Sequence, residues 1–445
     1  MVKTIIVDEN LLLYLTGVSQ QNAYAVGLIL GQSCLGQDYV IHFAKTPPCQ
    51  SEEDKKLGKP PIELGSLTDV NGNWLADHAR QATRMLSGGL HVLGLFVISP
   101  DDCLNPLNQK IKSLLQIVHN DLNNNKYIFG SPKSEKLIIH LSSKTQKYYG
   151  KTYDVHNHNV SPIDIKTQKK KWIQVQCDLK LNKLRYLLKD ECDWPLEKHI
   201  KVIMDEINGT LQSAVYLFDG EFKDKSDTLE SIGTKKIRHS RTKRGVQDDA
   251  ETLKPLKVSI LQTKCGQTVL YENITDTCGN IQLVGKVACK LWLQPKLTIN
   301  EAADAVREDI LRSLAARLEM HWDSLTEEEN SEDINSVHEP PRRVLISLPN
   351  SEVALSDYLF PGEGPQEAKM SLEELLDIKI DGELDITDVE GQADSLEVNK
   401  YYKSALNCDF IEDLPKITNP VNKLMYVGLA MSLIILLIAI MFNFF

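Results

Sequence analysis

The sequence predicts a mixed α/β protein with one membrane-spanning helix near its C-terminal end. Apolar strand-like segments alternate with amphipathic helical stretches along most of the chain, as in domains that pack helices against sheets. The segment His91–Ile98 (HVLGLFVI) is almost continuously apolar, which is typical of a strand covered on both faces. The segment 424–442 carries no charge over 19 residues. We therefore expect a folded body, which has enough apolar residues to bury a core, followed by a lipid-facing segment.

We assign residues 1–220 to a first domain. The pattern of Trp74–Leu86 is helical and ends at Ser87-Gly88-Gly89. Ile173 to Leu181 alternates strictly between apolar and polar residues, which indicates a half-buried strand. The other expected elements of this domain are strands at 4–7, 25–30, 39–44, 137–142 and 147–155, and helices at 106–122 and 195–217.

A basic linker is expected at 221–254, followed by a second, smaller α/β domain at 255–350. The basic residues of the linker fit a solvated connector, with a nuclear signal or processing site as the alternative. In the second domain, Thr298-x-x-Glu301 forms a capping box at the start of an amphipathic helix that extends to about residue 325. Strands are expected there at 257–262, 280–284, 287–293 and 344–348.

Acidic residues are concentrated in the stretch 351–423. Between residues 363 and 413 there are fifteen Asp and Glu and four Lys, so this stretch accounts for the whole net charge of −11. Because it has few apolar residues, we expect it to be largely disordered, or to fold onto a partner. The remainder of the chain is close to neutral, which argues against general nucleic-acid binding.

The segment 424–442 is interpreted as a tail anchor. At 1.5 Å per residue it spans about 28 Å, close to the thickness of the hydrocarbon core. Lys416 and Lys423 precede it, which favours a cytosolic body under the positive-inside rule. Residues expected to lie within the bilayer include Leu424, Gly428, Leu433, Leu437 and Phe442.

The nine cysteines are scattered and form no CxxC pair, so we expect most of them to be core residues in a reducing compartment. One motif contains candidate metal ligands. His156-Asn157-His158 followed by Ser161-x-x-Asp164 resembles the zinc pattern of JAMM isopeptidases, in which seven residues separate the two parts. Only two residues separate them here, too few for ligands that must converge from a strand end and a helix. An active zinc isopeptidase that uses His156 and His158 is kept as the alternative function.

A second resemblance to the JAMM-type enzymes lies earlier in the chain and has better spacing. Gly27-Leu-Ile-Leu-Gly31, a helix, and then Val92-Leu-Gly94-Leu-Phe-Val97-Ile-Ser99-Pro100 resemble the core of an MPN (JAMM-type) domain. Aligned on the glycines, the general-base Glu falls at Tyr24 and the two zinc histidines fall at Val97 and Ser99. The supporting Ser falls at Leu107 and the Asp ligand at Lys110. A site with these residues cannot hold and use Zn²⁺ as those enzymes do, so we expect an MPN-like domain without catalysis, metal or cofactor.

The whole chain resembles the odorant-response abnormal protein 4 family. The resemblance rests on GLILGQ at 27–32, on Asp38-Tyr-Val-Ile with Thr46-Pro-Pro, on Ala82-x-Arg-Met-Leu-Ser-Gly-Gly-Leu-x-Val-Leu-Gly94, on Arg307-x-Asp309-Ile-Leu and on the C-terminal anchor. It implies a non-enzymatic protein of the endoplasmic reticulum membrane that helps G-protein-coupled receptors, odorant receptors among them, to reach their destination. It also implies recruitment of the ubiquitin-fold-modifier-specific protease 2, which shares the MPN-like fold, by pairing of the two MPN-like domains.

Overall fold

The computed structural model describes the polypeptide at residues 3–50, 57, 64–124, 126–127, 130–235, 255–262, 276–327, 338–348, 351–380 and 386–390. Apart from His338, these residues all belong to one compact unit. The predicted tail anchor at 424–442 lies outside them. Among the described helices, none combines the length and the apolar character needed to cross a bilayer.

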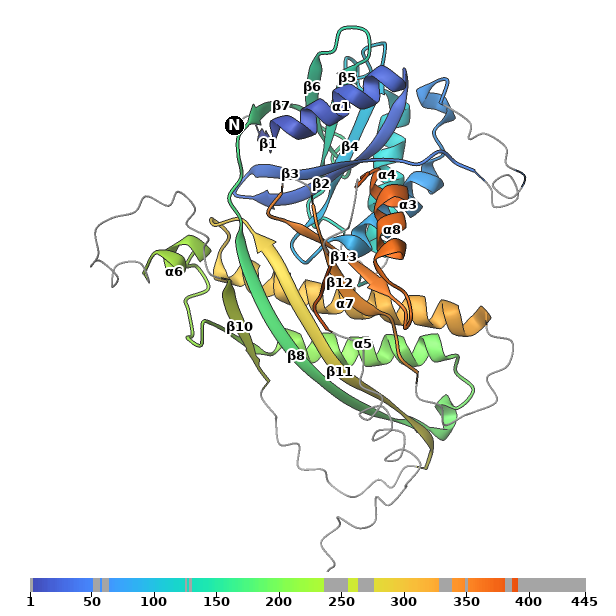
Figure 1. The fold of residues 1–445 in the computed structure, drawn as a ribbon, viewed down its shortest axis with the longest axis vertical. Helices are drawn as coiled ribbons and strands as arrows, with labels where there is room; N and C mark the ends of the chain where they lie inside the picture. Colours follow the sequence, from blue (N-terminus) through green and yellow to red (C-terminus); the bar gives the residue numbers. More distant parts are fainter. Residues whose placement is uncertain are drawn as a thin grey trace, which may run out of the picture. The chain divides into compact units, whose positions relative to one another are not determined.

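Seven strands of the first 167 residues form a closed barrel (Figure 1). Their order is β1-β3-β2-β4-β5-β6-β7, and β7 closes the barrel by pairing in parallel with β1. The near-continuous apolar run predicted as a strand is β4, which lies between β2 and β5 with eight consecutive buried residues. Gly94 is required there, because a Cβ atom at this position would lie 1.9 Å from the carbonyl oxygen of Leu137. The strands are β1 Lys3–Val7, β2 Ala25–Cys34, β3 Gln37–Lys45, β4 His91–Ser99, β5 Glu135–Ser142, β6 Tyr148–Asp154 and β7 Val160–Thr167.

Helices cover both faces of these strands. On one face, α1 (Glu9–Gln21) buries Leu15 and Val18 against a cluster that includes Phe43 and Phe96. On the other face, α3 (Gly72–Met85) and α4 (Gln109–Asn124) contribute to a larger core. The predicted helices at 74–86 and 106–122 are thereby confirmed, whereas α1 was not expected.

A second sheet has the order β11-β8-β10-β9, and helices α5 and α7 lie beside it (Figure 1). Its longest pair joins β8 to β11, from Ile173–Leu293 at one end to Leu188–Thr277 at the other. This pairing crosses the expected domain boundary at residue 220, so the first and second regions share one sheet. Two expectations change: the strands expected at 280–284 and 287–293 are one strand, and the helix expected to reach residue 217 ends at Gln212. The elements are β8 Ile173–Leu188, α5 Leu196–Gln212, β9 Val215–Phe218, α6 Leu229–Lys235, β10 Leu256–Leu261, β11 Thr277–Leu293 and α7 Ile299–Glu327, with single 3-10 turns at Leu67–Asp69 and Lys189–Glu191.

Residues 351–390 correct the expectation of a largely disordered acidic stretch. They provide β13 (Ala354–Leu359), α8 (Pro365–Leu376) and β14 (Ile386–Asp388), and the two strands flank β12 (Arg342–Ser347) in a three-stranded sheet. The apolar residues Ala368, Leu372 and Leu376 of α8 are fully buried, while Glu373 and Glu374 face solvent. The chain's own body therefore supplies the core that this stretch cannot form alone.

Two buried histidines hold the C-terminal end of α8. His42 of β3 lies 2.8 Å through Nε2 from the carbonyl oxygen of Leu376, and His78 of α3 lies 2.6 Å through Nε2 from that of Leu375. These carbonyls have no partner within the helix, so donation from the imidazoles satisfies them. Burial lowers the pKa of both histidines and outweighs the nearby carboxylates, so both rings are neutral at pH 7.

Candidate functional site

Three of the positions aligned with the MPN metal site, Tyr24, Val97 and Ser99, lie at the same end of the β2–β4 pair. Tyr24 precedes the pair Ala25–Ile98, and Ser99 follows it at the end of β4. Val97, on the same strand, is fully buried, and Leu107 is also buried. Lys110 is half-buried in the first turn of α4. Neither Val97 nor Leu107 has a side-chain atom that could ligate a metal.

Ser99 instead contacts a histidine that the sequence analysis did not single out. Its hydroxyl donates to the carbonyl oxygen of Asp101 at 2.8 Å and lies 3.0 Å from Nε2 of His140 on β5. Tyr149 stacks on the imidazole. Burial lowers the pKa of His140 and outweighs the effects of Ser99 and Asp102 that raise it, so the ring is neutral. No sequence motif marks His140, because it is brought to Ser99 by the parallel pairing of β4 and β5.

This Ser–His contact lacks the features of an activated nucleophile. Such a pair needs a third group that orients the base, but Nδ1 of His140 has no hydrogen-bond partner in the described part of the chain. Both side chains are almost completely buried, at 2% and 1% exposure, so a substrate could not reach the hydroxyl. The contact is best explained as packing at a barrel end.

The histidines of the alternative zinc site lie in the turn between β6 and β7, and each has another contact. His158 Nδ1 lies 2.7 Å from the hydroxyl of Tyr153, while the ring of His156 packs edge-on against His119 of α4. Ser161 and Asp164 lie on β7. Over the residues that the structure describes, no three His, Cys, Asp or Glu side chains are arranged to hold a metal ion. The described geometry therefore gives no support to the zinc-isopeptidase alternative.

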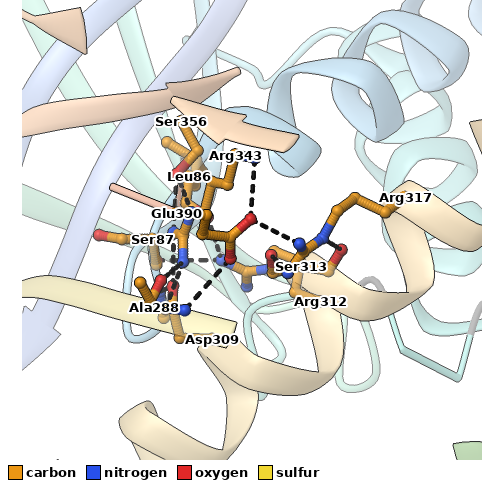
Figure 2. A network of polar contacts seen from close by, with 11 residues as sticks. Leu86, Ser87, Ala288, Asp309, Arg312, Ser313, Arg317, Arg343, Ser356 and Glu390 are labelled. Carbon is orange, nitrogen blue, oxygen red and sulfur yellow. Dashed lines mark hydrogen bonds and ion pairs between the residues drawn. The ribbon is translucent and has the colours of Figure 1, made fainter. Parts of the chain in front are cut away.

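The strongest polar cluster lies where two of the quoted sequence motifs meet (Figure 2). Asp309 of α7 and Arg343 of β12 form a bidentate pair at 2.7 and 2.9 Å, and each side chain is 1% exposed. Asp309 also accepts a 2.8 Å bond from the backbone N–H of Gly88. Arg343 donates in addition to Ser356 and to the carbonyl oxygen of Ala288. Burial acts to lower the pKa of Arg343, but Asp309 outweighs it and holds the guanidinium charged.

Arg312, one turn further along α7, binds the other side of the same turn. It donates to the carbonyl oxygens of Leu86, Ser87 and Leu90 at 3.0, 3.0 and 3.2 Å, and it pairs with Glu308. Glu308 in turn accepts from the backbone N–H of Gly89. Helix α7 thus binds the Ser-Gly-Gly-Leu turn in two ways: its carboxylates accept from backbone N–H groups of the turn, and Arg312 donates to backbone carbonyl oxygens.

The close approach of α7 to this turn explains the glycine at 88. A Cβ atom there would lie 2.0 Å from the carbonyl oxygen of Ala305, so any other residue would force the helix away. The motif Ala82–Gly94 and the motif Arg307–Leu311 are therefore two halves of one tertiary contact, 221 residues apart at Gly88–Asp309.

Glu390 extends the cluster to the C-terminal end of the described chain. Its carboxylate accepts from Arg317 at 2.6 Å and from the backbone N–H groups of Arg343 and Ala288 at 3.0 and 3.1 Å (Figure 2). We refer to Asp309, Arg343, Arg312, Glu308, Arg317 and Glu390 together as the polar cluster. Its buried members offer no surface to a substrate, so its role is to join α7, β11, β12 and the Ser87–Leu90 turn.

Comparisons with known proteins point to one family over most of the chain. The family model described as "ODR4-like: Odorant response abnormal 4-like" matches residues 27–387. "Protein odr-4 homolog" of Homo sapiens is 31% identical over 388 residues, covering 84% of this chain and 83% of that protein. "Odorant response abnormal protein 4" of Caenorhabditis elegans is 21% identical, covering 79% of this chain and 72% of that protein.

Among solved structures, that of UfSP from C. elegans aligns with a TM-score of 0.42 and 8% identity, over 85% of this chain and 56% of that chain. This similarity is too low to carry an argument. The family model and the relatives suffice: this chain belongs to the odorant response abnormal 4-like family.

Proposed function

We propose that this chain is a non-catalytic adaptor that recruits the ubiquitin-fold-modifier-specific protease to the endoplasmic reticulum membrane and assists the delivery of G-protein-coupled receptors, odorant receptors among them. The observation that carries the proposal is family membership combined with a barrel whose MPN metal positions are Tyr24, Val97, Ser99, Leu107 and Lys110. The names of the relatives refer to odorant response, which agrees with a role in receptor delivery. The predicted anchor at 424–442 would supply the membrane location, with the body in the cytosol.

A face of β6 and β7 is our candidate contact for the protease. Register pairs Tyr153 with Val160 and Lys151 with Pro162, so these side chains share one face, and alternation along β6 adds Tyr149 to it. Tyr149 is 43% exposed and Val160 is 37% exposed. Tyr153, the residue opposite Val160, is buried, so Tyr149 is the candidate anchor on this face, and exposed aromatic residues are typical anchors of protein interfaces.

The recruitment test uses the full chain with an N-terminal tag, expressed in cells and purified in mild detergent. A charged variant, Leu433→Arg/Leu437→Arg, disrupts the predicted span, and Leu433→Val/Leu437→Val is its conservative control. We expect the protease to co-purify with all three proteins, and its membrane fraction to fall only with the charged variant. If the protease co-purifies with none of them, the adaptor role is wrong.

The contact face is tested by Tyr149→Ser, with Tyr186→Ser as the matched control. Tyr186 is also an exposed tyrosine, at 52%, but it lies on β8 outside the barrel. An interface anchor contributes about 2 kcal/mol, so the affinity for the protease should fall roughly 30-fold for Tyr149→Ser only. Equal affinities of the two variants would exclude this face without excluding the adaptor role.

A further inference from the structure

Two cysteines differ from the rest in their surroundings. Cys192 follows β8, Cys278 lies near the start of β11, and both are exposed and joined by a disulfide. They are 86 positions apart in the sequence, and their Cα atoms are 6.4 Å apart. Most cysteines were expected to be core residues, and this pair is not among the buried ones. The expectation is correct for four others, which are buried: Cys34, Cys103, Cys177 and Cys289.

The two segments are also held together by contacts that do not involve sulfur. Lys189 pairs with Asp276 through its side chain at 2.8 Å, and its backbone N–H donates to the carbonyl oxygen of Asp276 at 3.3 Å. Leu188 pairs with Thr277 at the end of the β8–β11 ladder. These contacts do not involve sulfur, so they hold the two segments together independently of the disulfide.

The reduced thiols also have acceptors in place. The Sγ atoms of Cys192 and Cys278 lie 3.6 and 3.5 Å from the carbonyl oxygen of Leu188. One backbone acceptor therefore lies beside both sulfur atoms.

The buried cysteines are protected from the same chemistry. The thiolate is the reactive form, and burial disfavours it. Burial raises the pKa of Cys34 and Cys103 to about 11 and that of Cys177 to about 12. Burial thus disfavours reaction at these three cysteines, because it restricts access and disfavours the thiolate.

We propose that Cys192 and Cys278 form a reversible thiol–disulfide site that exchanges with small disulfides such as oxidised glutathione. One protein thiolate attacks a sulfur of the glutathione disulfide, which gives a mixed disulfide and one glutathione thiolate. The second protein thiolate then attacks the protein sulfur of the mixed disulfide and releases the second glutathione. The protein loses two electrons, the glutathione disulfide gains them, and the two thiol protons pass to the two glutathione molecules.

Oxidation adds a covalent tie between β11 and the segment that leads into α5. That segment carries Trp194, whose ring contacts Lys198 and His199 of the first turn of α5. After reduction, the Lys189–Asp276 contacts and the strand ladder still join the same junction. The redox state therefore sets how firmly the end of the β8–β11 ribbon is fixed to α5.

The test is thiol mapping of the native full chain in detergent, equilibrated at a series of ratios of reduced to oxidised glutathione. Free thiols are trapped with N-ethylmaleimide, and peptides are identified by mass spectrometry. We expect a Cys192–Cys278 peptide pair under oxidising ratios, and alkylation of both cysteines before the four buried ones under reducing ratios. With Cys192→Ser, Cys278 should instead retain glutathione as a mixed disulfide, whereas Cys49→Ser should leave the exchange unchanged.

Two results would overturn the proposal. If the bond yields to glutathione only after denaturation, it is a static crosslink. If oxidising ratios produce no Cys192–Cys278 peptide while Cys192→Ser and the parent both accumulate glutathione, the two thiols do not pair. Hydrogen exchange of peptides covering 189–199 supplies a second readout: we expect faster exchange in the reduced protein and no such difference in Cys192→Ser.

Discussion

Replacing Asp309 by alanine should destabilise the protein more than any other single change in the polar cluster. The variant leaves the guanidinium of Arg343, at 1% exposure, without its bidentate partner, and it leaves the N–H of Gly88 without its acceptor. Removal of one member of a buried ion pair costs about 3–5 kcal/mol, since an uncompensated charge remains in the interior. This is a large fraction of the roughly 5–15 kcal/mol that stabilises a typical domain.

Urea unfolding of the full chain in detergent, followed by tryptophan fluorescence, measures this cost. Asp304→Ala is the matched control, because Asp304 lies on the same helix and pairs with Arg307 at 3.2 Å with 55% of its side chain exposed. We expect the control to cost no more than about 1 kcal/mol. The double variant Asp309→Leu/Arg343→Met should recover much of the loss, because no charge is then left unpaired. A cost for Asp309→Ala as small as that of the control would refute the assignment of a buried, mutually dependent pair.

Further predictions concern the α7 contact and the docking of α8. Gly88→Ala should cost about 1–3 kcal/mol by overpacking against Ala305, measured by the same unfolding assay, and a neutral result would show that α7 can move away. Leu372→Ala should cost about 2–5 kcal/mol, because the side chain is fully buried, and hydrogen exchange in α8 should rise with it. His42 and His78 have folded pKa values below the ordinary 6.5, so the unfolded chain binds more protons below pH 6.5. The contribution of the two groups to stability should therefore be constant above about pH 7 and fall below pH 6.5, with a slope of up to about 2.7 kcal/mol per pH unit. The variant His42→Gln/His78→Gln should lose this component of the slope, and an unchanged pH profile would contradict the neutral, buried assignment.

Much of the barrel could be predicted from local pattern. Strands β4 and β5 are nearly continuous apolar runs, and α3 and α4 have clear helical spacing, so each was expected within a few residues. Helix α1 was missed because Leu11, Leu12 and Leu13 are consecutive and give no helical stripe.

The polar cluster could not be predicted, for a physical reason. Arginine is rarely buried, so nothing in the local sequence marks Arg312 and Arg343 as core residues. Their partners lie far away in the chain, at Leu86 and Asp309, and a single sequence does not reveal such pairing. The docking of α8 was missed for the same reason. Its acidic composition indicates disorder, and only the structure shows that the distant residues His42 and His78 bind its C-terminal end.

The positions aligned with the MPN metal site could be identified from the sequence, but their neighbours in the structure could not. The alignment on Gly27, Gly31 and Gly94 pointed to Val97 and Ser99, which the structure places on β4, with Ser99 at its end. It could not reveal His140, which reaches Ser99 only through the pairing of β4 with β5.

The most direct test of the adaptor account is the membrane fraction of the ubiquitin-fold-modifier-specific protease in cells that lack this chain. Fractionation followed by quantitative immunoblotting would compare cells restored with the parent, with Leu433→Arg/Leu437→Arg, or with Ser99→Ala. The account predicts that the protease leaves the membranes when the chain is absent and returns with the parent and with Ser99→Ala, but not with the charged double variant. A membrane fraction of the protease that does not depend on this chain would contradict the account.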